Sequence, residues 1–216
     1  MRQTLKNWIG MGVMGAVMAT GMNVQAEDEV TVTTDLQLPA GNIVIETGLG
    51  SGNNRWKYSN DIKPGEHRDV GQRFYTQEGA FVLDKIVLHI ANISSGIGAT
   101  TPGARFTLTL LKFTSSDDVE PEGEPVGVFH GTIPLELMPD HYFIMDIPNT
   151  PLEDGVSYGF LLAFDEPSSG NALYFTTGGT MRYTGGSIFF YTNSENANEM
   201  RYEKAQGHFS FYLISE

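Results

Sequence analysis

The sequence predicts an all-β protein that folds as one jelly-roll-like β-sandwich of about ten strands. Short runs rich in β-branched and aromatic residues are separated by clusters of Gly, Asn, Ser, Asp and Pro, a pattern typical of strands joined by turns. Within the runs, apolar and polar residues alternate with the two-residue period of a half-buried strand. After residue 26, no segment keeps the 3.6-residue period of an amphipathic helix.

The first 26 residues predict a different element, a signal peptide that is removed on export. Arg2 and Lys6 give it a positively charged start, and residues 8–22 form an apolar run rich in Gly, Ala, Val and Met. The segment Val24-Gln25-Ala26 suits cleavage because its residues at the key positions are small. We therefore expect residues 27–216 to form the folded domain outside the cytoplasm, either in the periplasm or secreted from the cell.

Four strands are expected in the first half of the domain. Residues 30–34 and 42–46 are rich in Val, Ile and Thr, and residues 70–76 begin a third run. The clearest strand covers residues 83–91, because its apolar residues recur at every second position. This strand presents Ile86, Leu88 and Ile90 on one face and Lys85, Val87 and His89 on the other.

Seven strands are expected in the second half. Residues 105–111 and 156–164 are apolar or aromatic at alternate positions, so one face of each is expected in the core. The last strand covers residues 208–214. The others cover residues 126–132, 142–147, 173–177 and 187–192. Between residues 193 and 203 we expect at most one turn of helix.

Composition narrows the classes of partner and chemistry. The chain has no cysteine, which excludes disulfides, thiol nucleophiles and cysteine zinc sites. It carries 26 acidic against 13 basic residues, a formal net charge of −13 that disfavours nucleic acid and anionic membranes. No second apolar stretch approaches the roughly 20 residues of a membrane helix. The expected partners are a polysaccharide or a cell-surface or matrix component, with neither nucleic acid nor, after signal cleavage, a membrane.

The histidines leave an enzymatic alternative open. None of the five has the spacing of a metal site such as His-x-His or His-Glu-x-x-His. The fold could still place His130 or His141 beside a tyrosine such as Tyr142. A Tyr–His pair serves as base and acid in many polysaccharide lyases, and paired carboxylates serve glycoside hydrolases. A small jelly-roll enzyme that degrades polysaccharide is therefore the alternative to a non-catalytic module.

One acidic run predicts the only candidate metal site. Asp117, Asp118 and Glu120 begin a stretch of five acids that ends at Glu124. Crowded carboxylates are the oxygen ligands that calcium prefers, although the run lacks the spacing of an EF-hand loop. The alternative is a solvated hairpin loop. Calcium is the one cofactor that the sequence leaves open.

Aromatic residues in polar surroundings are the best binding candidates. Trp56 is the only tryptophan after the signal peptide, and it lies with Tyr58 in a polar stretch that alternates little. Tyr183, Tyr191 and Tyr202 lie in the Gly-rich, polar last third of the chain. Flat aromatic faces beside polar groups can stack on sugar rings. The alternative for Trp56 is packing at the rim of the core.

Two neighbouring segments resemble a known family. The residues Val70-Gly-Gln-Arg-Phe-Tyr-Thr76 and Phe81-Val-Leu-Asp-Lys-Ile-Val-Leu-His-Ile90 are similar to the GQ-x-F-x-T and Y-x-L-D-x-V-x-L pattern of bacterial choice-of-anchor domains. Residues 105–113, 152–162 and 206–214 resemble further strands of that family in the same order. The resemblance implies a secreted β-sandwich and implies no reaction, because fold-level similarity does not supply one.

The sequence thus predicts an exported, non-catalytic β-sandwich module. Carbohydrate binding is the favoured role, and a surface or structural role that assembles through strand edges is the other non-catalytic possibility. The lyase or hydrolase is the alternative. An exposed aromatic platform, a long unprotected edge strand, or a groove with converging Tyr, His and Arg would separate the three.

Overall fold

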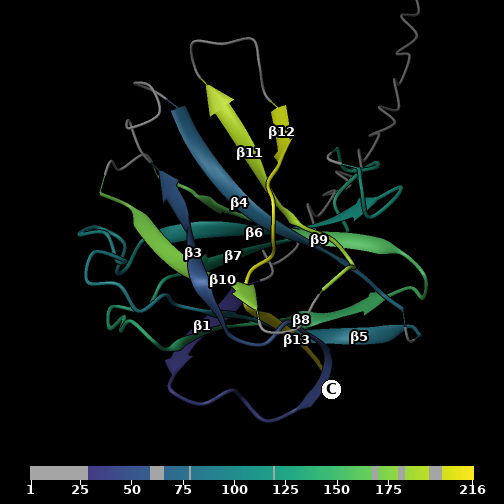
Figure 1. The fold of residues 1–216 in the computed structure, drawn as a ribbon, viewed down its shortest axis with the longest axis horizontal. Coiled ribbons are helices and arrows are strands. Elements are labelled where there is room, and N and C mark those ends of the chain that lie inside the picture. Colours follow the sequence, from purple (N-terminus) through teal and green to yellow (C-terminus); the bar gives the residue numbers. More distant parts are fainter. Residues whose placement is uncertain are drawn as a thin grey trace, which may run out of the picture.

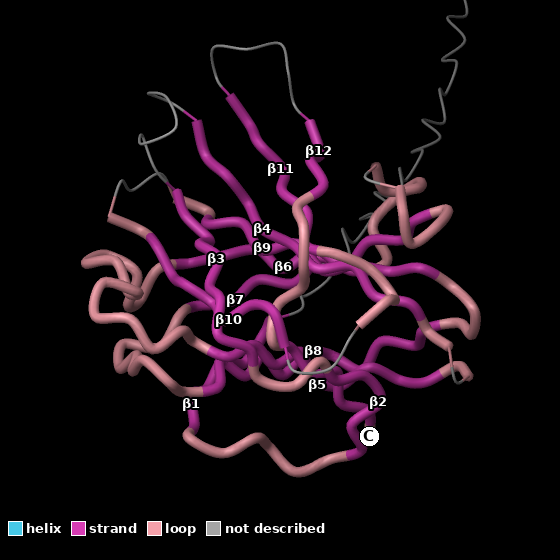
Figure 2. Tube along the Cα trace, viewed as in Figure 1, coloured by secondary structure: helices cyan, strands magenta, loops and turns pink. Residues whose placement is uncertain are grey.

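The computed structural model describes residues 29–58, 66–77, 79–118, 120–166, 170–179, 183–194 and 201–216. The expected signal peptide lies outside the described residues. The described chain is all-β, with thirteen strands and no helix (Figures 1 and 2), which confirms the predicted fold class. Among these residues, no helix has the length and apolar character needed to cross a membrane.

Most strands fall where the alternation predicts them. The first seven are β1 (Glu29–Asp35), β2 (Asn42–Glu46), β3 (Gly50–Tyr58), β4 (Glu66–Tyr75), β5 (Phe81–His89), β6 (Arg105–Phe113) and β7 (Gly127–Thr132). The other six are β8 (Tyr142–Leu152), β9 (Ser157–Phe164), β10 (Ala172–Gly179), β11 (Ile188–Ser194), β12 (Arg201–Lys204) and β13 (Phe211–Ser215).

The strands form one continuous sheet that curls over itself (Figure 1). Its order is β10-β3-β4-β9-β6-β7-β1-β8-β5-β13-β2, with β11 also paired to β4 and β12 to β11. Strand β1 joins the two layers: Glu29 and Val30 pair in parallel with β7, whereas residues 31–35 pair antiparallel with β8. At the opposite end, β10 approaches the second layer through the bridges Ile90–Phe175 and Thr177–Phe209.

The inner faces of the two layers enclose an aromatic core. Ile86, Leu88 and Ile90 are fully buried in it, as the alternation of residues 83–91 predicts. The opposite face of the same strand is also covered, which the sequence does not indicate. Val87 packs there with Ile144, Tyr212 and Ile214, and Leu38 covers them. The second half of β5, residues 86–89, is therefore buried on both faces.

Strands β3 and β12 are absent from the sequence-based prediction. β3 has the unfavourable composition Gly-Ser-Gly-Asn-Asn-Arg-Trp-Lys-Tyr, but pairing with β10 and β4 holds it extended. Pairing can override a low intrinsic β-propensity. In the segment 193–203, where the sequence allows at most one turn of helix, residues 193–194 belong to β11 and residues 201–203 to β12; residues 195–200 lie outside the described chain.

Candidate functional site

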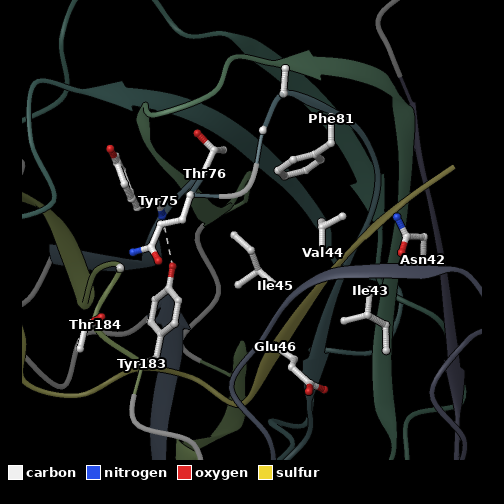
Figure 3. Close-up of a pocket in the computed structure, with 14 residues that line it drawn as sticks. Asn42, Ile43, Val44, Ile45, Glu46, Tyr75, Thr76, Phe81, Tyr183 and Thr184 are labelled. Carbon is white, nitrogen blue, oxygen red and sulfur yellow. Dashed lines mark hydrogen bonds between the residues drawn. The ribbon is translucent and has the colours of Figure 1, made fainter.

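A groove of about 510 Å³ lies between edge strand β2 and residues 75–77, 79–81 and 183–185 (Figure 3). Its floor is apolar, because Val44, Ile45, Phe81 and Tyr183 are partly buried against the main core. Polar residues, among them Asn42, Thr76, Gln77 and Thr184, also line it. The lining exposes more polar than apolar surface, so the groove combines an apolar patch with several polar groups, and its volume falls within the usual range of about 300–1,000 Å³ for ligand sites.

A β-bulge in β2 shapes this floor. Ile45 pairs with Leu213 and Ile43 with Ile214, so Val44 is the extra residue of the ladder. The bulge brings two consecutive side chains toward the same side: Figure 3 shows Val44 and Ile45 pointing into the groove, whereas Ile43 points away. Within the described residues, β2 pairs only with β13. The groove therefore runs along the edge of the sheet.

Thr76 fixes the opposite wall. Its side chain is almost fully buried, and its hydroxyl donates to the carbonyl of Glu153 at 2.6 Å and accepts from the amide of Val156 at 3.0 Å. The carbonyl of Thr76 accepts from the amide of Gly155 at 2.8 Å. These bonds tie the chain after β4 to the turn between β8 and β9. The wall is thus positioned by two connections that are remote in sequence.

Tyr183 is the predicted ligand residue that the fold brings into the groove. Its hydroxyl accepts a hydrogen bond from the amide of Tyr75 at 3.2 Å, as the dashed line in Figure 3 shows. Its ring stands edge-on to Phe211, with 5.4 Å between ring centroids. Burial raises the pKa of the Tyr183 phenol far above its ordinary value, so the group is a neutral phenol at physiological pH.

Gly185 permits this position of Tyr183. A Cβ atom at residue 185 would lie 2.4 Å from the Tyr183 hydroxyl oxygen and 2.6 Å from the ring carbon that bears it. The ring is held between Phe211 and His208, so it has little freedom to move aside. A glycine is therefore needed beneath the ring, and the Gly-rich composition around Tyr183 has a local steric reason.

A second cavity of about 560 Å³ adjoins the groove. The two share four lining residues, which are Tyr75, Gln77, Thr184 and Gly185. The Tyr75 ring extends toward the second cavity, since its hydroxyl oxygen is 3.6 Å from where a Cβ of Gly155 would lie. Hydroxyl side chains of residues 114–116 and Ser157 also line it. One chain segment, residues 75–77, thus borders both spaces.

Trp56 is not available to a ligand, which corrects the expectation that it forms a binding platform. Its side chain is 0% exposed and stacks on Phe164, with ring centroids 4.0 Å apart and planes 10° from parallel. Phe106 meets the indole edge-on at 5.6 Å. The polar neighbours in sequence concealed this position, because adjacent residues of a strand point to opposite faces of the sheet. The side chain of Tyr58 lies outside the described part of the chain.

Tyr191 and Tyr202 lie together on the outer face of the first layer. They are paired across β11 and β12, and their ring centroids are 4.7 Å apart. Tyr202 also contacts the fully buried Phe189, which contacts Phe113. Burial, together with Asp69, raises the pKa of Tyr191 and of Tyr202. These two tyrosines form a surface separate from the groove of Tyr183.

The acidic run is organised around Arg73 in the described structure. Arg73 is fully buried, donates to the backbone carbonyl of Asp118 and donates to the Ser187 hydroxyl at 2.6 Å. Burial lowers its pKa, whereas Asp117 and Asp118 oppose that shift as nearby negative charges. Glu120 is exposed, beside Tyr202. Among the described residues, no group of three or more His, Asp or Glu is placed to hold a metal ion.

In the described structure, Tyr142 is paired with neither His130 nor His141, the two histidines that the sequence left open for an enzymatic site. In the described chain, Tyr142 meets the ring of His89 edge-on at 5.2 Å, and neither His130 nor His141 has a ring contact with it. His89 is 6% exposed, and its Nδ1 lies 2.9 Å from the Thr176 hydroxyl oxygen. His130 lies instead on the face of β7 beside Thr107, 3.1 Å from its hydroxyl oxygen.

A serine motif typical of hydrolases occurs at residues 155–159 and was not recognised from the sequence. Residues 155–159 read Gly-Val-Ser-Tyr-Gly, the Gly-x-Ser-x-Gly spelling of a hydrolase nucleophile elbow. An elbow needs a sharp turn from a strand into a helix. Ser157 instead begins β9, pairs with both Tyr75 and Phe113, and is 5% exposed. The motif here is the start of a central strand.

Gly71 and Gln72, the most specific part of the family-like pattern, have structural roles. A Cβ at Gly71 would lie 2.3 Å from the Phe189 ring, so only glycine leaves room for it. The buried Gln72 side chain accepts from the amide of Phe209 at 2.9 Å and donates to the carbonyl of Arg73 at 2.8 Å. Gln72 therefore links β4 to the segment that leads into β13.

Compared with models of known protein families and with curated proteins, the chain matches none. The choice-of-anchor resemblance thus stays a resemblance of motifs. The features of the molecule that bear on its function are the groove, its neighbouring cavity and the surfaces around them.

Proposed function

We propose that this protein is an exported, non-catalytic β-sandwich module that binds carbohydrate in the groove beside β2. The observation that carries the proposal is the composition of that groove, in which the rings of Tyr183 and Phe81 accompany Val44 and Ile45 in the apolar floor below a polar rim. The C–H faces of a sugar pack on aromatic rings, and its hydroxyls need polar groups at the edge. The features of residues 1–26 support export.

The bulge in β2 favours a sugar over an extended peptide. A peptide that adds to a sheet edge needs a regular row of backbone donors and acceptors. β2 has only five residues and is interrupted at Val44. Short, bulged edge strands are a common protection against added strands. The same bulge also argues against a role in which copies of the module assemble through this edge.

A retention experiment tests the proposal. Protein lacking residues 1–26 is passed over immobilised neutral polysaccharides, and the eluate is assayed for new reducing or unsaturated ends. We expect retention without product, and we expect Tyr183→Ala to lose at least about tenfold in affinity because the ring that closes the groove is removed. Tyr183→Phe keeps the ring and loses only the acceptor for the Tyr75 amide, so it retains most of the binding.

Tyr191→Ala is the matched control, because it removes a tyrosine ring from the separate outer surface. It is expected to bind as wild type does. Loss of binding in Tyr191→Ala with none in Tyr183→Ala would move the site to the outer surface. Release of product by the wild type would support the lyase or hydrolase instead, and failure of every polysaccharide to retain the wild type would contradict carbohydrate binding.

A further inference from the structure

We infer that the groove and the second cavity form one binding path, and that its ligand is a linear, uncharged polysaccharide chain that occupies both. This inference depends on the proposed function and adds the length and charge of the ligand to it. Tyr75, Gln77, Thr184 and Gly185 line both spaces, so the two lie side by side at these four residues. Each space is by itself of ordinary ligand size.

The chemistry of the second cavity favours an uncharged chain. Its side chains include several hydroxyls, and its two charged lining residues have partners in the described structure. Lys112 Nζ lies 3.6 Å from Glu153 Oε2, and Glu122 accepts from the Thr114 hydroxyl at 3.4 Å. A polyanion would enter without a free cation to meet it and against the formal charge of −13. Sugar hydroxyls can exchange hydrogen bonds with such a wall at no comparable cost.

Arg73 holds the two halves of this path together. Its guanidinium donates to the carbonyl of Asp118, next to the segment 114–116 that lines the second cavity. It also donates to the Ser187 hydroxyl, two residues after the shared wall at Gly185. These two hydrogen bonds connect the loop that contains Asp118 to the segment that follows Gly185. A path that is formed before the ligand arrives loses less entropy on binding.

Ligand length is the direct test of the inference. Binding of neutral β-linked gluco- and xylo-oligosaccharides of two to six units is measured by calorimetry with protein lacking residues 1–26. We expect the affinity to rise at least about tenfold between the shortest and longest members of the series that binds. Equal affinity for all lengths would overturn the extended path and leave the proposed function intact.

A variant separates the second cavity from the first. Ser116→Trp places a bulky ring in the loop that lines only the second cavity, and Ser94→Trp is the matched control on an exposed turn that lines neither. Ser116→Trp is expected to bind the hexamer about as weakly as wild type binds the dimer, with dimer binding unchanged. Wild-type affinity for the hexamer in Ser116→Trp would overturn the inference.

The charge of the ligand and the proposed function are tested by separate measurements. Oligogalacturonates of matched length are expected to bind at least about tenfold more weakly than neutral oligomers. Equal or tighter binding of the charged oligomers would overturn the uncharged ligand. If Tyr183→Ala abolishes binding of every length while Ser116→Trp changes nothing, the proposed function stands and the extended path fails. If no glycan binds the wild type, both fail.

Discussion

Trp56 shows how a residue that is polar in its sequence context becomes part of the core. Its neighbours in sequence are Arg55 and Lys57, yet the indole stacks on the ring of Phe164 and meets the ring of Phe106 edge-on. Its N–H is buried without a hydrogen-bond partner among the described residues. The stacking and burial of the ring therefore account for its position.

We expect Trp56→Ala to lower the free energy of unfolding by about 3–5 kcal/mol, the usual cost of deleting a large buried aromatic side chain. Trp56→Phe is the control: it keeps a ring against Phe164, removes the unpaired N–H and is expected to cost less. Circular dichroism followed through urea unfolding measures both. A loss below about 1 kcal/mol in Trp56→Ala, with reduced glycan affinity, would return Trp56 to the list of ligand residues.

His89 is a buried titratable residue on the outer face of the second layer. Burial lowers its pKa below the ordinary 6.5; the negative charge of Asp140 opposes this shift, and a positive His141 adds to it. The folded state therefore binds fewer protons than the unfolded state as the pH falls below 6.5. The contribution of His89 to stability is complete above pH 6.5 and is lost as the pH falls through the folded-state pKa.

We predict that the wild type loses stability relative to His89→Gln below pH 6.5, by at most about 1.4 kcal/mol per pH unit. The difference in unfolding free energy between the two proteins is measured from pH 8 to pH 5, so that titration of other groups largely cancels. Between pH 8 and pH 7 the difference is expected to be constant. A constant difference down to pH 5 would contradict the prediction, because it would show that folding does not lower the pKa of His89.

At the scale of elements, the loop that follows β6 is the clearest case of an element whose role depends on a distant strand. Its acids lie close together in sequence and could serve calcium, but Arg73 of β4 lies beneath them and bonds to the Asp118 carbonyl. The positive charge beside Asp117 and Asp118 is thus the guanidinium of Arg73. Edge strand β2 is a second case, since its bulge directs Val44 into the groove.

We predict that Arg73→Met lowers the unfolding free energy by about 2–3 kcal/mol, because two hydrogen bonds from a charged donor are lost.

Wild-type protein is expected to show no rise in melting temperature with millimolar calcium. Asp117→Asn with Asp118→Asn is the control for charge alone. A calcium-dependent rise that this double variant removes would contradict the prediction and make the loop a calcium site.

At the scale of the whole molecule, the sheet curls until its two layers meet on both sides of the core. Strand β1 connects the layers on one side of the core, and bridges from β10 to Ile90 and Phe209 connect them again. The groove lies where edge strand β2 meets the segments after β4 and before β11 (Figures 1 and 3). Its walls are therefore a consequence of how the sheet curls, with contributions from three parts of the chain.

Much of the fold could be predicted from local patterns. The alternation at Ile86, Leu88 and Ile90 places these residues correctly in the core, because a strand with one apolar face has one stable orientation. The same pattern did not indicate that Val87 is buried, since its cover comes from Tyr212 and Leu38. Of the candidate site, Tyr183 was found from sequence, whereas Thr76, Gln77 and the bulge at Val44 have no local signal.

By itself, the sequence determined the fold class and most strand positions, because strand periodicity and turn residues are properties of neighbouring residues. It also determined the acidic charge and the absence of cysteine chemistry. Only the tertiary structure decided which aromatic residues are exposed, which cation faces the acidic loop and where the groove lies. Those features depend on pairings such as Arg73 with Asp118 and Tyr183 with Tyr75, whose partners are far apart in the chain and meet only when the sheet curls.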